Sequence, residues 1–259
     1  MVNQLSLQED EAVFPDAEQL ITEDDTPVDN FASEKQQRLL TSALFSSLKD
    51  RQPFIAAANV GIYHTFPGTA IVPDVFVSFG VAVPKDWWEK QNRCYLVWKF
   101  GKPPEIAIEV VSNKVGKELT DKLAIYERMR VSYYAVYDPN RQLGKVPLRL
   151  FELQGMQYRE MPEPWMEQVS LGLTLWDGEF EGSPNTWLRW QDGNGQLLLT
   201  GDEQAEQERD RAAQAQVQAG QERDRAAQAQ ADLERERERA DRLAAYLRSQ
   251  GIDPDQLPQ

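Results

Sequence analysis

The sequence has 259 residues, 41% of them hydrophobic, which is enough to bury the core of one sizeable domain and leave room for extensions. Its one cysteine, Cys94, cannot form an internal disulfide, and its one histidine, His64, excludes HExxH metalloproteases, which need two histidines. No apolar run approaches the ~20 residues of a membrane span, and the acidic N-terminus is not typical of a signal peptide. We therefore predict a cytoplasmic protein with no membrane segment.

The net charge of −14 is distributed unevenly along the chain. Residues 1–30 contain nine acidic residues and no basic one, and residues 200–259 contain 14 acidic residues and nine arginines. Residues 31–199 are neutral overall, and within them residues 85–150 hold 13 basic residues against eight acidic ones. The central part of the chain is therefore able to contact a polyanion, although the whole chain is acidic.

The first elements are an acidic arm, a helix and a group of strands. Residues 1–28 lack hydrophobic periodicity and are predicted to be a flexible arm. A helix is predicted to begin near Ser33, with Gln36 completing a capping box. Residues 53–83 then alternate in the manner of β-strands, with turn-forming residues between them.

An aromatic and charged segment, residues 85–102, interrupts the strand pattern. We expect an insertion with a short helix there, packed by Trp87, Trp88 and Trp98. Strand and helix patterns then resume at residue 103 and continue to about residue 180. The order of helix, strands, helix and strands predicts an α/β (α+β) domain over residues 29–190.

A long exposed helix is predicted over residues 204–250, after a linker at 191–203 and before a tail at 251–259. The stretch QERDRAAQAQ occurs twice, 14 residues apart, and small apolar residues recur every seven positions. This pattern is typical of an exposed helix or a coiled coil, but alanine buries little area, so self-association would be weak. The recurring residues are Ala205, Ala212, Ala219, Ala226, Leu233, Ala240 and Leu247.

Glu109 lies in the middle of a strand-like apolar stretch, PPEIAIEVVSNK (residues 103–114). A lone charge in a buried strand costs several kcal/mol unless a partner compensates it. Asp74, directly after Pro73 in AIVPDVFVSF, is a second carboxylate within strand-like sequence. Two such acids are compensated if they share a divalent cation, and Mg²⁺ prefers a few carboxylates together with water.

Lys122 is the lysine best placed to complete such a site. On a helix whose inward face carries Leu119, Leu123 and Tyr126, Lys122 lies at the shoulder of that face. Its ammonium can therefore reach back over the neighbouring strands.

Structural interpretations of the same residues stay open. Asp74 can begin a turn after its proline, and Glu109 can pair with a structural arginine. Lys122 can form a helical pair with Glu118, four residues before it. Spacing alone does not decide between these interpretations and a metal site.

Three stretches, VPDVFVSF, PPEIAIEVVSNKVGKE and DKLAIYERMRVSYYAVYDP, resemble the putative restriction endonuclease family of the PD-(D/E)XK nuclease superfamily. Asp74 with its preceding proline matches the PD half, and Glu109 begins a match to that family's E-V-[LIV]-S element. The resemblance covers roughly residues 33–180. The positions that match its following helix and strand are Lys122, Tyr126, Tyr134, Asp138 and Pro139.

The resemblance implies a restriction-endonuclease-like core, with a mixed sheet flanked by helices. It also implies hydrolysis of DNA phosphodiester bonds with Mg²⁺, or Mn²⁺ as a substitute, bound by Asp74 and Glu109, with Lys122 as the catalytic lysine. An acid on the first helix often assists in the superfamily, and Glu34 is the nearest match. Many nucleases of this fold dimerise to cut both strands, so the resemblance makes a homodimer a further expectation.

One position departs from the superfamily pattern. The lysine usually lies two residues after the glutamate, where this chain has Val111, so Lys122 would be a migrated lysine. If Lys122 does not reach the carboxylates, the alternative is a non-catalytic, nuclease-like scaffold that recruits a protein partner through residues 204–250.

Overall fold

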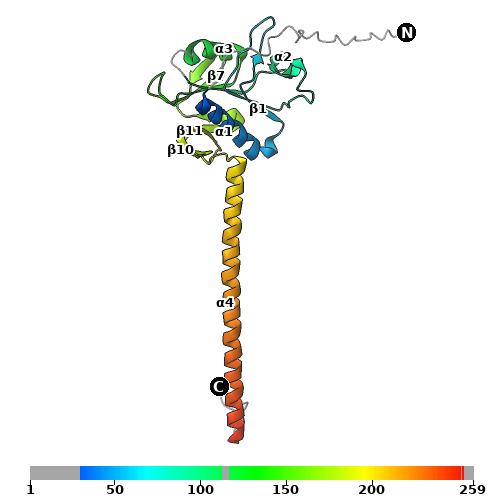
Figure 1. Ribbon diagram of the computed structural model, residues 1–259, viewed down its shortest axis with the longest axis vertical. Helices are drawn as coiled ribbons and strands as arrows, with labels where there is room; N and C mark the ends of the chain where they lie inside the picture. Colours follow the sequence, from blue (N-terminus) through cyan, green and yellow to red (C-terminus); the bar gives the residue numbers. More distant parts are fainter. Residues whose placement is uncertain (1–29, 113–116, 252, 254–259) are drawn as a thin grey trace, which may run out of the picture. The chain divides into compact units, whose positions relative to one another are not determined.

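The computed structural model describes residues 30–112, 117–251 and 253, and these residues form two compact units. The first unit ends at Gly201 and contains the strands of the described chain, and the second is Asp202–Gln259 (Figure 1). The arm predicted at residues 1–28 lies outside the described residues.

A six-stranded mixed sheet forms the centre of the first unit, in the order β1-β3-β5-β6-β7-β8. Strands β5 and β6 are parallel, and every other neighbouring pair in this sheet is antiparallel. A mixed sheet flanked by helices, together with a long C-terminal helix, confirms the predicted α/β (α+β) fold class. The strands are β1 (Phe54–Ala58), β3 (Val75–Phe79), β5 (Ile106–Val110), β6 (Tyr133–Tyr137), β7 (Leu148–Gln154) and β8 (Gln157–Glu160).

Strand β5 is buried on both faces, because its alternate side chains enter two separate hydrophobic clusters. Ile106 and Ile108 belong to the first cluster, whereas Ala107 and Val111 belong to the second. This double burial explains the nearly continuous apolar run in the sequence. By the same alternation, Glu109 lies on the face of the second cluster.

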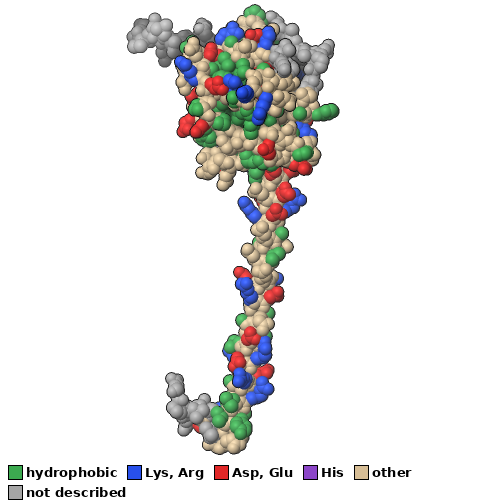
Figure 2. Space-filling model, turned by 90° about the vertical axis from the view of Figure 1, so that its left-hand side faces the viewer, with side chains coloured by type: hydrophobic (Ala, Val, Ile, Leu, Met, Phe, Trp, Pro, Cys, Tyr) green, Lys and Arg blue, Asp and Glu red, His purple; other side chains and the backbone are tan. Residues whose placement is uncertain are grey.

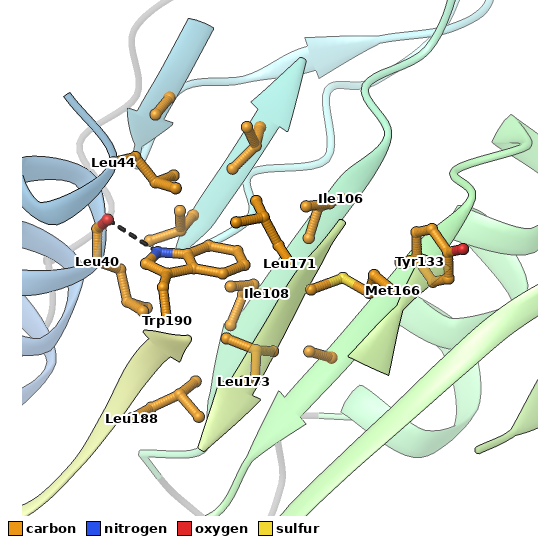
Figure 3. Packing of buried hydrophobic residues seen from close by; sticks show 14 of the residues in the cluster. Leu40, Leu44, Ile106, Ile108, Tyr133, Met166, Leu171, Leu173, Leu188 and Trp190 are labelled. Atoms are coloured by element: carbon orange, nitrogen blue, oxygen red, sulfur yellow. Dashed lines mark hydrogen bonds between the residues drawn. The ribbon is translucent and has the colours of Figure 1, made fainter. Parts of the chain in front are cut away.

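Helix α1 and a three-stranded sheet cover the face of the first cluster (Figure 3). Leu40 and Leu44 point from α1 toward Trp190, whose indole Nε1 donates a hydrogen bond to the Leu40 carbonyl oxygen at 2.9 Å. This bond joins the first helix to a strand 150 residues later. The covering elements are α1 (Phe31–Ser47), β9 (Trp165–Met166), η5 (Glu167–Val169), β10 (Leu171–Phe180) and β11 (Ser183–Gln191).

The N-terminus of α1 differs from the predicted capping box. Asn30 is the N-cap, and its Oδ1 accepts hydrogen bonds from two backbone N–H groups, one of them that of Ser33. Gln36 is buried and exchanges two hydrogen bonds, at 2.8 and 2.9 Å, with the backbone of Leu188 in β11. Gln36 therefore attaches the helix to the smaller sheet and does not cap it.

Two short helices cover part of the opposite face and connect β5 to β6. The helix predicted to carry Lys122 and Tyr126 forms as a π-helical turn, η4 (Glu118–Lys122), followed by α3 (Leu123–Met129). Tyr126 is fully buried, as predicted, and its ring lies 4.8 Å from that of Tyr134 in β6. Single π-helical turns are frequent at functional sites.

The packing of the insertion at residues 85–102 follows the prediction only for Trp98, which is partly buried against the cluster of Tyr63, Cys94 and Leu96. Trp87 and Trp88 are 58% and 79% exposed, because they lie on a turn before the first short helix of the insertion. Tyr95 forms the interior instead, stacking on Phe100 at 4.3 Å and meeting Phe76 edge-on at 5.2 Å. The small elements here and before it are η2 (Lys49–Arg51), β2 (Ile62–Tyr63), η3 (Lys90–Asn92), β4 (Tyr95–Leu96) and α2 (Val97–Phe100).

Helix α4 (Gly201–Ser249) makes up most of the second unit and buries none of its described side chains. Figure 2 shows charged side chains of both signs along it. It begins three residues before the predicted start at 204. The predicted linker at 191–203 is not extended chain, since Gln191 bridges Leu197 and Leu198 is buried in the core of the first unit.

Among the described residues, no helix is long and apolar enough to cross a membrane.

Candidate active site

Asp74 lies directly before β3, and Glu109 lies in the neighbouring strand β5, at the same end of the main sheet. Strand β3 pairs with β5 so that Val75 is opposite Ile108. Continuing this antiparallel register by one residue places Asp74 opposite Glu109. Directly opposed residues have Cβ atoms about 4.5–5.5 Å apart, so the register brings the two carboxylates together.

Asp74 is held by hydrogen bonds on both of its carboxylate oxygens. The side-chain Nε2 of Gln37, on α1, donates to Oδ1 at 2.7 Å, and the backbone N–H of Val110 donates to Oδ2 at 2.6 Å. Gln37 in turn accepts a hydrogen bond from Asn59 at 2.9 Å. Asp74 is only 8% exposed, so it belongs to a buried polar network beyond the end of β3 and is more than a turn residue.

Glu109 is 1% exposed, and both of its carboxylate oxygens accept hydrogen bonds. The ammonium of Lys122 donates to Oε2 at 2.8 Å, and the Tyr126 hydroxyl donates to Oε1 at 2.7 Å. The partner of Glu109 is therefore a lysine and not a structural arginine. A neighbouring cation and two hydrogen bonds to its oxygens together offset the desolvation of a buried carboxylate.

Lys122 lies between two buried carboxylates. Its Nζ is 2.8 Å from Oε2 of Glu109 and 3.6 Å from Oε1 of Glu118. The pair of Lys122 with Glu118 on the helix and the contact of Lys122 with Glu109 therefore exist together. Glu118 is 5% exposed, and within the described chain its Oε2 has no hydrogen-bond partner.

The protonation equilibria of this cluster are strongly shifted. Burial raises the pKa of Glu109 to about 8, the nearby Lys122 charge lowers it, and the Asp74 charge raises it. Burial opposes the charge on Lys122, but the neighbouring carboxylates outweigh it and raise the Lys122 pKa. The raised pKa of Lys122 favours its charged form, whereas the raised pKa of Glu109 favours its protonated form. Shifts of this kind in a cluster of interacting groups mark candidate functional sites.

Glu34 is not brought to this cluster. Its side chain is 57% exposed and pairs with Arg38 at 3.0 Å. The residue of α1 that reaches the site is Gln37, three positions before the buried Leu40. A glutamine on the apolar stripe of a helix is a signal that could have identified it, because buried polar side chains need partners.

Replacing Gln37 with leucine should lower the free energy of unfolding by about 1–3 kcal/mol, because it removes a donor from the buried Asp74 carboxylate. Urea denaturation followed by tryptophan fluorescence measures this loss. Gln157→Leu, at an exposed position on β8, is the control and should change stability by less than about 0.5 kcal/mol. Equal effects of the two substitutions would contradict the role of Gln37.

Asp74 and Glu109 fit a divalent cation of the Mg²⁺ type. Their carboxylate oxygens are hard, anionic ligands of the kind that Mg²⁺ prefers. A shared cation would also relieve the repulsion that contributes to the raised Glu109 pKa. Among the described residues, no group of three or more acidic, histidine or cysteine side chains is arranged so that it could hold a metal ion. Mg²⁺ often needs only one or two carboxylates, with water and substrate oxygens completing its shell.

Comparisons with known proteins point to one family. The model of the Uma2 family, described as "Putative restriction endonuclease", matches residues 21–177. A crystal structure of a putative nuclease belonging to DUF820, from Anabaena variabilis, shares 18% sequence identity over 54% of this chain and 72% of that chain, with a TM-score of 0.38. A comparison with curated proteins gave no match. Because the family model spans more than half of the sequence, this chain belongs to the putative restriction endonuclease family, in agreement with the resemblance of its motifs.

Proposed function

We propose that the protein is a Mg²⁺-dependent DNA endonuclease that hydrolyses phosphodiester bonds, with Mn²⁺ as a substitute metal. Membership of the family supports a nuclease function. The observation that carries the proposal is the convergence of two buried carboxylates and an ammonium group at one end of the sheet. In this assignment Asp74 and Glu109 are the metal ligands, and Lys122 is the catalytic cation.

Each side chain has a distinct part in this proposal. A cation held by Asp74 and Glu109 would supply electrostatic stabilisation for phosphodiester hydrolysis. Lys122 is 32% exposed in its side chain, so its ammonium can meet a phosphate that approaches from solvent and stabilise negative charge on it. Tyr126 and Gln37 fix the orientations of the two carboxylates through the hydrogen bonds described above.

The charge distribution supports DNA as the substrate. The segment around the site, residues 85–150, has 13 basic residues against eight acidic ones, and contacts of Lys and Arg with phosphates dominate DNA affinity. We place this activity in the cytoplasm, because the lone Cys94 fits a compartment in which structural disulfides are rare.

Metal dependence is tested by incubating supercoiled plasmid with the full chain and Mg²⁺, Mn²⁺ or a chelator. Nicking should occur with either metal and stop with the chelator. Asp74→Asn should abolish both nicking and calorimetric Mg²⁺ binding, because it removes the charge of one ligand. Asp50→Asn, at an exposed position in η2, should leave both unchanged. Cleavage that survives the chelator and Asp74→Asn would overturn the proposal.

Helix α4 supports a second, separate proposal, that the protein associates with a second copy or a protein partner through this helix. The helix is 49 residues long, and Leu233, Leu243 and Tyr246 are 53%, 59% and 62% exposed on it. Hydrophobic side chains are visible near its C-terminal end in Figure 2. Apolar residues at heptad spacing are suited to contact another helix, as in a coiled coil.

Sedimentation at several protein concentrations tests this association. We expect weak, concentration-dependent dimerisation of the natural chain, which Leu233→Asp combined with Leu243→Asp should abolish, because two charges would enter the apolar contact. Gln228→Asp combined with Arg237→Asp adds the same side chains at other exposed positions of the helix and is the control. A natural chain that stays monomeric at all concentrations would rule out the homodimer and leave only a different partner.

A further inference from the structure

An apolar cavity of about 500 Å³ opens on the first unit. It is lined by β1, by β3 and by the insertion that follows β3. A cavity of this volume lies within the range of small-molecule sites and can hold a planar ring system. The lining residues that matter for the argument are Ala57, Phe76, Trp87, Trp88, Arg93 and Tyr95.

Phe76 in the cavity wall and Glu109 lie on the same face of the sheet, that of the second cluster. Phe76 belongs to the cavity wall, and Asp74 lies two residues before it, just before the start of β3. Phe76 is opposite Ala107, which lies two residues before Glu109. Residues two apart on a strand share a face and are separated by about 6–7 Å. The part of the cavity wall formed by Phe76 is therefore two residues along the sheet from Asp74 and from the position opposite Glu109.

The rim of the cavity combines exposed aromatic rings with positive charge. Trp87 and Trp88 are 58% and 79% exposed, and Arg93 Nε donates a hydrogen bond to the Trp88 carbonyl oxygen at 3.1 Å, which holds its guanidinium beside the rim. Residues 85–102 carry five basic residues against two acidic ones. Aromatic rings among cations are characteristic of surfaces on which unpaired bases stack while the backbone phosphates are neutralised.

We propose that this cavity receives an unpaired nucleobase of DNA, stacked on Trp88, from the strand whose phosphodiester lies at Asp74 and Glu109. A paired base is not accessible to such a cavity inside the double helix, so the preferred substrate is DNA with single-stranded nucleotides beside the cleavage site. The position of the scissile bond rests on the proposed nuclease function, whereas the binding of the base does not. The charge complementarity with phosphates favours this occupant over a neutral apolar ligand.

Binding is tested by fluorescence anisotropy of the full chain with labelled DNA in the presence of a chelator. Three probes are compared: a duplex with a single-stranded gap, the same gapped duplex with abasic sites in the gap, and the fully paired duplex. The gapped duplex with bases should bind about tenfold more tightly than the other two. Trp88→Ala should abolish this difference, and Trp88→Tyr should restore most of it, because a tyrosine ring also stacks. Phe31→Ala, at a 92% exposed aromatic residue on α1, is the control and should keep the natural preference.

Each other outcome overturns the assignment of the cavity. Equal binding of the three probes, or an unchanged preference in Trp88→Ala, would show that no base enters it. A dimer that dissociates in Trp88→Ala would show that a second copy of the chain covers it. Cleavage of the same probes in Mg²⁺ separates the two proposals: base-dependent binding without cleavage would contradict only the proposed nuclease function, and cleavage without base dependence would contradict only the assignment of the cavity.

Discussion

Glu109→Gln should reduce Mg²⁺-dependent cleavage of plasmid DNA by about a thousandfold or more and leave the chain folded. A metal ligand contributes several kcal/mol to the stabilisation of developing charge, and about 4 kcal/mol corresponds to a factor of a thousand in rate. Glutamine keeps the shape of the side chain: its oxygen can accept from Lys122 while its NH2 group donates to the Tyr126 hydroxyl oxygen, so the substitution removes the charge and preserves the packing.

Rates of plasmid nicking measure this effect, and Glu160→Gln supplies the control. Glu160 lies on β8 with its side chain 45% exposed and pairs with Arg149 on β7, so its loss should leave the rate unchanged. Glu109→Gln should also abolish calorimetric Mg²⁺ binding. Natural cleavage rates in Glu109→Gln would exclude Glu109 as a metal ligand and, with it, the proposed mechanism.

Lys122→Met should destabilise the protein in a pH-dependent way, because it removes the cation beside the buried Glu109 carboxylate. The Glu109 pKa in the folded state, about 8, exceeds its ordinary value of 4.5, so the folded state binds the Glu109 proton more tightly than the unfolded state does. The stability that this proton contributes to folding is fully present below about pH 4.5 and is lost as the pH rises through the folded-state pKa. Removal of Lys122 raises that pKa further, since the Lys122 charge and hydrogen bond both lower it. The loss should be small near pH 5, where Glu109 in the folded state is already protonated, and about 3–5 kcal/mol at pH values above the folded-state pKa.

Urea denaturation at acidic, neutral and alkaline pH measures this dependence. Lys117→Met is the matched control: Lys117 precedes η4 and pairs with Asp121, but the two side chains are 65% and 60% exposed, so its loss should cost less than about 0.5 kcal/mol at any pH. Lys122→Met should also slow DNA cleavage by about a hundredfold or more, as expected for a group that stabilises transition-state charge. If cleavage persists while stability falls, Lys122 is a structural partner of Glu109 and not the catalytic cation.

Several features of the fold could be predicted from the sequence because they depend on local patterns. The alternation in residues 103–114 correctly places Ile106 and Ile108 on one face and Ala107 and Val111 on the other. The helical spacing predicts the buried Tyr126, and the repeated polar stretch predicts the exposed helix α4. Burial in strands and helices follows periods of two and 3.6 residues, and neighbouring residues alone reveal these periods.

The composition of the site was predicted in part. Asp74, Glu109 and Lys122 stood out because charged residues in apolar elements need partners, but the sequence left open which partners they have. The structure shows Gln37 and Val110 on Asp74, and Tyr126 beside Lys122 on Glu109. It also leaves Glu34 outside the cluster, although Glu34 is only three residues from Gln37.

These outcomes depend on contacts between residues that are distant in sequence. The register between β3 and β5 decides that Asp74 is opposite Glu109, and a shift of one residue would turn one of the two carboxylates to the other face. Lys122 ends the π-helical turn, and from this position its ammonium contacts Glu109 in the sheet. The composition and local periodicity of this chain thus determine which residues are buried, whereas strand register and helix packing, which no short segment encodes, decide which of the buried charges meet.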